Sequence, residues 1–76
     1  MKDLLIYIAR NLVENPDAVC VTEVQRESDV TLELRVAPED MGKVIGRQGR
    51  IAREIRKLLS AYGQRTGMRV SVDIVD

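Results

Sequence analysis

Apolar side chains recur along the first half of the chain with the period of a helix and then with that of strands. Between residues 3 and 14 they fall three and four positions apart, which predicts an amphipathic helix. Asn15 and Pro16 end this helix, because proline disfavours the helical conformation in the residue before it. Residues 19–26 are rich in β-branched side chains and predict a strand. Residues 30–36 alternate apolar and polar side chains, which predicts a second strand with one apolar face.

The second half of the chain contains two predicted helices on either side of a glycine pair. A short helix extends from Pro38, a residue that suits the first helical position, to Ile45. The segment Gly46-Arg47-Gln48-Gly49 interrupts the helical pattern. A longer helix follows over about residues 50–62, with Gly63 placed to cap its C-terminus.

A third strand is predicted over residues 68–75, after a loop that closes at Gly67. The order is therefore helix-strand-strand-helix-helix-strand. Because each strand has one apolar face, we expect an α+β fold with three helices on one side of a three-stranded mixed sheet. The first two strands should pair antiparallel across a short turn, and the two-helix crossover should make the third strand parallel to its neighbour. At 76 residues the whole chain, 1–76, is expected to form a single domain.

The composition removes several classes of function. The chain has no histidine and one cysteine, which excludes an internal disulfide, a cysteine-rich zinc cluster and the usual general base. We therefore expect no catalytic residues, no metal, no cofactor and no small-molecule substrate. Cys20 is expected to be a small buried apolar residue. No membrane span and no export signal are found in the sequence, so a cytoplasmic protein without a membrane partner is expected.

The net charge is zero, but the charges are unevenly distributed along the chain. The segment from Lys43 to Lys57 contains six basic residues and one acidic residue, which gives a local charge of +5. Residues 1–42 carry four basic and nine acidic residues, a charge of −5. Such asymmetry concentrates positive potential on one surface, which favours an anionic partner.

The glycine pair lies within this basic segment and has a physical interpretation. Glycine allows a tight turn between two helices, and the turn ends where the next helix begins with unpaired N–H groups. We therefore expect the main-chain amides from Gly46 to Gly49 to be open to a phosphate backbone. Cationic side chains around the loop would add attraction that does not depend on base sequence. These side chains are Lys43, Arg47, Arg50 and Arg53.

The stretch VIGRQGRIAREIRKLL resembles the signature of the KH domain, an RNA-binding fold in which a GXXG loop clamps single-stranded backbone. The predicted order of elements is similar to the type II version of this fold. More narrowly, APEDMGKVIGRQGRIAREIRKLLSA and the closing VDIVD resemble the KhpA (YlqC) family of small bacterial single-KH proteins. This resemblance implies an RNA chaperone or post-transcriptional regulator that binds single-stranded RNA in the cytoplasm. It also implies a homodimer or a heterodimer with a KhpB-like protein, and links to cell division and cell shape.

By the same resemblance, bases would lie in a cleft between the two helices that flank the loop and the second strand. Its apolar floor would include Val44, Ile45, Ile51 and part of the strand over residues 30–36. These apolar residues fit a role in the core equally well. Neither tyrosine falls in a predicted strand, which argues against an aromatic stacking platform.

Two other functions remain open at this level. A GXXG sequence alone fits any tight helix–helix turn, and the acidic first half favours a protein–protein interaction module with little RNA contact. A helix-turn-helix DNA reader is disfavoured, because the first of its helices is short and the unit lies between strands. Glu54 is expected to pair with Arg50 or with Lys57, which lie four and three residues away.

Overall fold

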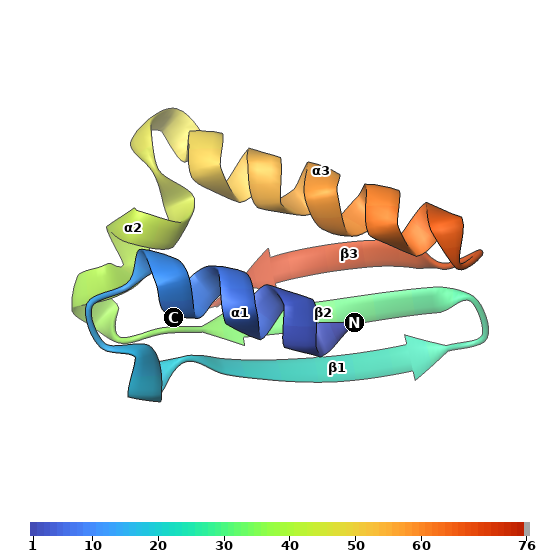
Figure 1. Cartoon of the computed structure of the whole chain (residues 1–76), viewed down its shortest axis with the longest axis horizontal. Coiled ribbons are helices and arrows are strands. Elements are labelled where there is room, and N and C mark those ends of the chain that lie inside the picture. Colours follow the sequence, from blue (N-terminus) through green and yellow to red (C-terminus); the bar gives the residue numbers. More distant parts are fainter. Residues whose placement is uncertain (76) are drawn as a thin grey trace.

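The computed structural model describes residues 1–75, and its elements follow the predicted order. They are α1 (Lys2–Leu12), β1 (Cys20–Arg26), β2 (Asp29–Arg35), α2 (Met41–Ile45), α3 (Arg50–Arg65) and β3 (Arg69–Ile74). Single 3₁₀ turns precede β1, α2 and α3 (Figure 1). The short helix predicted from Pro38 to Ile45 is thus a 3₁₀ turn followed by α2.

The three strands form one mixed sheet in the order β1-β2-β3. β1 and β2 pair antiparallel, with Val21 opposite Leu34, across the two-residue turn Glu27-Ser28. β3 pairs parallel to β2, with Val72 opposite Leu32. Both pairings agree with the sequence prediction, since a short turn suits antiparallel strands and a long crossover suits parallel ones. In Figure 1, α3 runs along β3, whereas α1 lies over β1 and β2.

The core lies between one face of the sheet and the helices. From the sheet, Leu32 and Leu34 are fully buried, and they pack with Leu5 of α1, Val44 of α2 and Leu59 of α3. Burying each leucine side chain contributes about 2 kcal/mol, so the alternation in β2 holds all three helices to the same face. Thr31 and Glu33, which point to the opposite face, stay partly exposed.

The C-terminal end of α3 differs from the prediction. The helix continues past residue 62 to Arg65, and Gly63 lies buried inside it rather than at its cap. A Cβ at Gly63 would overlap the side chain of Val70 and lie 2.9 Å from the carbonyl oxygen of Met68. Gly63 is therefore needed for the close approach of α3 to β3, and the chain reverses four residues later, at Gly67, where φ is +75°.

Cys20 is exposed, so the expectation of a buried thiol was wrong. It is the first residue of β1, and the next residue, Val21, is the buried one. Because successive side chains of a strand point to opposite faces, Val21 places Cys20 on the face that no helix covers.

Candidate nucleic-acid interface

The Gly46–Gly49 loop projects from the end of the molecule where α2 meets α3 (Figure 1). Gly46 has φ +76° and ψ 174°. Because these angles lie outside the helical region, α2 ends at this residue. Gly49 is the N-cap of α3, as the sequence predicted. Between them Gln48 has φ +57°, which is uncommon for a residue with a side chain and keeps the turn tight.

Gly46 also lets the loop fold against the first turn of α3. A Cβ at this position would lie 2.6 Å from Cγ1 and 2.9 Å from the main-chain nitrogen of Ile51. Real Cβ atoms do not approach other atoms so closely, and here the backbone itself would have to move. The first glycine is therefore required by packing, independently of any ligand.

The loop amides are less open than the sequence led us to expect. The N–H of Gly46 donates to the carbonyl of Gly42 at 2.9 Å, and that of Gly49 donates to the carbonyl of Gly46 at 3.1 Å. The N–H of Arg50 donates to the carbonyl of Arg47. The backbone leaves the helical conformation at Gly46, so the regular hydrogen bonds of α2 end there. Of the four loop amides, those of Arg47 and Gln48 are therefore the two candidates for binding an anion.

The predicted cationic side chains lie around the loop, and they differ in whether they already contact other groups of the protein. Arg47 is exposed on the loop itself. Arg53 reaches back from α3, and its Nη2 donates to the carbonyl of Gln48 at 3.0 Å, which fixes the loop to the helix. Lys43 Nζ lies 3.5 Å from Oδ1 of Asp40. Arg50, also exposed, lines an apolar groove beside the loop.

Asp40 is a buried carboxylate whose role the sequence did not reveal. The sequence placed it only at the start of the short helix, yet its oxygens accept the N–H groups of Glu14 at 3.2 Å and Asn15 at 3.0 Å. Burial by itself raises the pKa of Asp40. The hydrogen bonds from Asn15 and Glu14, together with Lys43, outweigh burial and hold this pKa below its ordinary value of 3.8. Asp40 thus ties the segment after α1 to the start of α2.

The residues expected to floor a base cleft are more buried than such a floor requires. Val44 is 0% exposed and belongs to the core, as do Leu32 and Leu34 of β2. Ile45 and Ile51 are only partly buried and lie at the edge of the core, on the two sides of the loop. Of the proposed floor, these two isoleucines are therefore the side chains that remain accessible near the loop.

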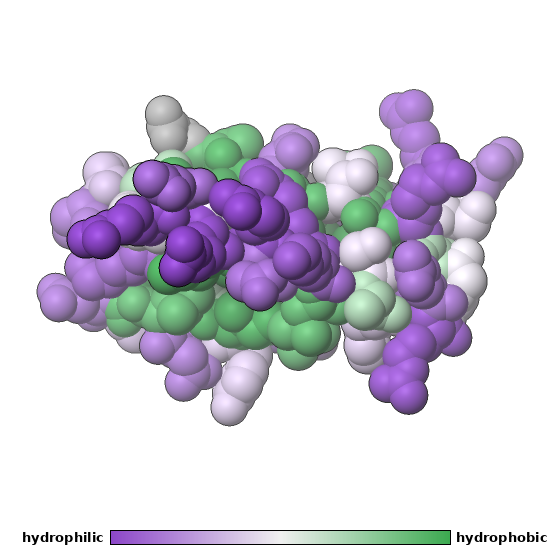
Figure 2. Space-filling model, turned by 90° about the horizontal axis from the view of Figure 1, so that it is seen from above, coloured by the Kyte–Doolittle hydropathy of each residue, from purple (hydrophilic) through white to green (hydrophobic). Residues whose placement is uncertain are grey.

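An apolar groove of about 430 Å³ lies between α1 and α3 and begins at the loop. Its lining residues are Ile8, Leu12, Arg50, Ile51, Glu54, Ile55 and Leu58. Figure 2 shows hydrophilic side chains gathered over the upper side of the molecule and a hydrophobic strip beside them. Leu58 is 51% exposed, so this face of α3 leaves apolar surface in contact with solvent. Glu54 pairs with Lys57 at 3.4 Å, one of the two predicted partners.

Among residues 1–75, no cluster of side chains is suited to hold a metal ion. None of the helices in this range is long and apolar enough to cross a membrane.

A β1-β2-β3 sheet covered on one face by three helices, with a GXXG turn between the last two of them, is the arrangement of a KH domain. The chain belongs to the KhpA/KhpB KH-domain family, whose model matches residues 2–74. The resemblance seen in the sequence is thereby confirmed.

Curated relatives match over nearly the whole chain. A protein of Clostridium acetobutylicum named RNA-binding protein KhpA is 55% identical over 75 residues, which are 99% of this chain and 100% of the relative. Proteins of the same name from Aquifex aeolicus and Treponema pallidum are each 49% identical, over 100% and 99% of this chain and 96% and 94% of their own lengths. No solved structure matches the chain.

Proposed function

We propose that this protein binds single-stranded RNA through the Gly46–Gly49 loop. The observation that carries the proposal is the tip of the loop, where exposed Arg47 and Gln48 stand between two glycines and among cationic side chains. The amides of Arg47 and Gln48 would donate to phosphate oxygens, and Arg47 and Arg50 would supply charge. The family membership and the names of the relatives support RNA as the partner.

Lys43 and Arg53 have supporting parts in the same proposal. Arg53 holds the loop through the carbonyl of Gln48 and keeps further N–H groups for a phosphate. Lys43 shares its charge with Asp40 and therefore contributes less to binding than Arg47. Ile45 and Ile51 would contact bases at the edges of the loop, whereas Val44 would act from the core by fixing α2.

The proposed activity is binding rather than catalysis. A domain that touches about four nucleotides binds weakly and with little selectivity, which suits an RNA chaperone or a post-transcriptional regulator in the cytoplasm. The resemblance to small bacterial KH proteins extends this proposal to RNAs that affect cell division and cell shape.

A double substitution at the loop tip tests the proposal. Arg47→Asp with Gln48→Asp replaces a cation and a neutral side chain by two anions, which repel phosphate, and aspartate tolerates the positive φ of residue 48. We expect RNA affinity to fall below detection in a fluorescence anisotropy titration while the melting temperature changes little. The matched control is Gln25→Asp with Arg26→Asp, which makes the same charge change at the end of β1 and should leave RNA affinity nearly unchanged.

The salt dependence of binding gives a second readout. Each neutralised phosphate contributes about −0.7 to the slope of log K against log salt, so three or four contacts predict a slope of about −2 to −3. An affinity that does not change with salt, or that survives the double substitution, would favour the protein-interaction alternative.

We also propose that the chain pairs with a second copy of itself through the α1–α3 groove. Exposed Leu58 lines this groove, and exposed Tyr62 lies four residues further along α3. A 76-residue domain gains stability by covering such surface. Leu58→Glu should then give a monomer in analytical ultracentrifugation. A wild-type chain that is itself a monomer would contradict the homodimer, and a KhpB-like protein would then be tested as the partner that binds the α1–α3 groove.

A further inference from the structure

β1 forms a free edge of the sheet. In the described part of the chain its one neighbouring strand is β2, which pairs with all seven of its residues. In Figure 1 no helix or strand lies beside β1 on its other side. Every second residue of an edge strand points its N–H and C=O groups away from the neighbouring strand, and these groups can pair with a further strand. None of the proposals above uses this edge.

The two edges of the sheet differ in how they are covered. At the β3 edge, Nε of Arg56 donates to the main-chain carbonyl of Val72 at 3.1 Å, so a side chain of α3 already occupies an acceptor. On β1 the one acid is Glu23, and its carboxylate accepts the main-chain N–H of Lys2 at 3.1 Å. Because charged side chains often protect an edge strand from pairing, it matters that Glu23 is already engaged by α1. Of the two edges, β1 is therefore the one open to a further strand.

A pocket adjoins the free edge on the face of the sheet that no helix covers. It has a volume of about 380 Å³ and is lined by Val24 and Arg26 of β1 and by Asp29 and Thr31 of β2. Val24 lies opposite Thr31 and Arg26 lies opposite Asp29, so all four side chains project from the same face. Val24 is 46% exposed and supplies apolar surface to this pocket.

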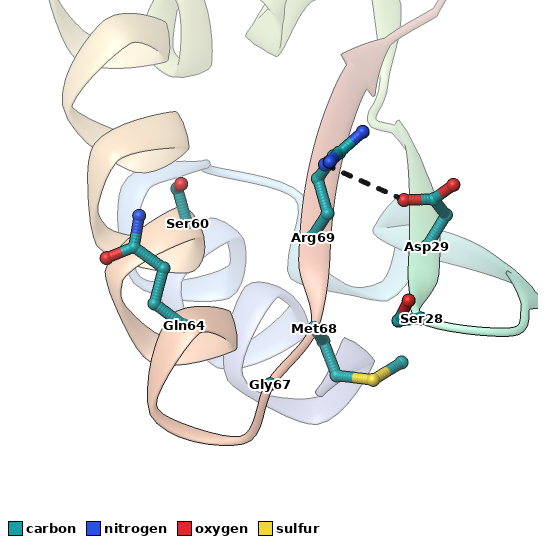
Figure 3. Close-up of a pocket in the computed structure, with 7 residues that line it drawn as sticks. All are labelled: Ser28, Asp29, Ser60, Gln64, Gly67, Met68 and Arg69. Carbon is teal, nitrogen blue, oxygen red and sulfur yellow. Dashed lines mark ion pairs between the residues drawn. The ribbon is translucent and has the colours of Figure 1, made fainter.

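The charges around the pocket leave one cation over. Oδ1 of Asp29 lies 3.9 Å from Nε of Arg69, and Figure 3 shows these two side chains directed toward each other. Arg26 is exposed, and within residues 1–75 it forms no ion pair. The pocket therefore combines apolar surface at Val24 with available positive charge at Arg26.

We propose that β1 accepts an extended segment of another protein as a fourth strand, with an apolar side chain beside Val24 and an acidic side chain, two residues away, beside Arg26. Main-chain hydrogen bonds along the free edge would supply affinity, and the pocket would select the side chains. This interaction uses neither the Gly46–Gly49 loop nor the α1–α3 groove, so it does not depend on RNA binding.

A second copy of this chain fits the pocket poorly. In a two-fold antiparallel pair of β1 strands, side chains that lie opposite each other project from the same face of the sheet. Arg26 would then lie opposite a second Arg26 or a neutral residue, because Glu23, the one acid of β1, projects from the other face. The acidic side chain must therefore come from a different protein.

Titration of the full, isotope-labelled chain with synthetic peptides tests the proposal. The probe has seven residues, the length of β1, and consists of threonine apart from glutamate at its third position and valine at its fifth. We expect it to shift the NMR signals of the β1 amides and of Thr31, and to leave those of the Gly46–Gly49 loop unchanged. A control peptide with lysine in place of glutamate should bind about fivefold more weakly, because it places a like charge beside Arg26.

Arg26→Glu should reverse this preference, so that the lysine peptide binds more tightly than the glutamate peptide. Arg35→Glu is the matched control, because it makes the same charge change at an exposed position on the same face that does not line the pocket. It should keep the preference of the wild type. Val24→Thr keeps a β-branched side chain but removes apolar contact, and it should weaken the binding of both peptides about threefold.

Several results would overturn the proposal. They are equal affinity of the wild type for both peptides, a preference that Arg26→Glu leaves unchanged, and the absence of β1 shifts with either peptide. Shifts of the β1 amides on adding an oligouridylate, or on concentrating the chain by itself, would identify RNA or a second copy as the occupant and would overturn it as well. Circular dichroism melting of each variant shows that the fold is retained.

Discussion

At both ends of α3 a glycine allows the backbone to approach a neighbouring segment closely, but the side chains around the two glycines differ. At the N-terminal end, Gly46 allows the loop to pack against Ile51, and at the C-terminal end, Gly63 allows α3 to approach Met68 and Val70. In each case a Cβ would meet main-chain atoms, so both glycines are needed for packing. A glycine in a tight connection is therefore not by itself a sign of a ligand site.

The difference between the ends lies in the charge of the side chains. At the N-terminal end, exposed Arg47 and Arg50 have no acid between them, the buried carboxylate of Asp40 pairs with Lys43, and the carboxylate of Glu54 pairs with Lys57. At the C-terminal end, Asp29 offsets Arg69. The N-terminal end therefore carries exposed positive charge without a paired acid, whereas at the C-terminal end the positive charge of Arg69 is paired. The same backbone geometry gains a function only from the side chains that surround it.

The largest expected effect on stability comes from adding a Cβ at Gly46 or at Gly63, where the backbone lies close to other main-chain atoms. Gly46→Ala and Gly63→Ala should each destabilise the protein by about 3 kcal/mol, because the neighbouring main chain must move. For a domain of this size that corresponds to a decrease in melting temperature of about 15 °C, measured by circular dichroism. If either variant melts like the wild type, the packing role assigned to that end is wrong.

Gly42→Ala is the matched control for both substitutions. Gly42 lies in α2, and a Cβ there would meet no atom within 4 Å. Because alanine is the better helix former, this variant should be as stable as the wild type or more stable by up to about 1 kcal/mol.

The next effect concerns Asp40, the one buried charged residue within residues 1–75. Its pKa in the folded protein lies below 3.8, so the stability it contributes is fully present above that pH and is lost as the pH falls through the lowered pKa. Asp40→Asn cannot accept the N–H groups of both Glu14 and Asn15, and it should be less stable than the wild type at neutral pH. Urea unfolding at several pH values should show this difference shrinking as the solution becomes acidic. A difference that stays constant down to acidic pH would contradict the assignment.

The smallest effect is expected from single arginines at the two ends. Arg53→Ala removes the hydrogen bond to the carbonyl of Gln48 and should cost about 0.5 kcal/mol, since the group is exposed. It should also make the salt slope of RNA binding shallower by about 0.7, the value of one phosphate contact. Arg65→Ala, at the other end of α3, should change neither quantity. Equal effects of the two substitutions on RNA binding would remove the functional distinction between the ends.

Much of the fold follows from local patterns. The alternation over residues 30–36 predicted the strand that forms the centre of the sheet, and the short turn before it and the two-helix crossover after it predicted both pairings. Pro16 placed the end of α1 within a few residues. These signals are local, because a period of two or of 3.6 residues reports which face of an element is buried.

The errors concern how different elements pack against each other. Gly63 looked like a helix cap because glycine often ends helices, yet the partner that demands it is Val70 on β3. Asp40 lies within the short helix predicted from Pro38 to Ile45, but its hydrogen bonds go to Glu14 and Asn15, more than twenty residues earlier. Cys20 was misplaced because a strand of mixed composition does not show which parity faces the core.

For this protein, the sequence by itself determined the order of elements, the position of the glycine loop and the concentration of positive charge around it, because each of these depends on neighbouring residues only. The tertiary structure decided how open the loop is. The amides of Gly46 and Gly49 are taken by carbonyls of the chain, Lys43 is shared with a buried carboxylate, and Val44 lies in the core. Each of these facts depends on which atoms the fold brings within a few ångströms of each other, and hydrogen bonds and ion pairs act only at that range.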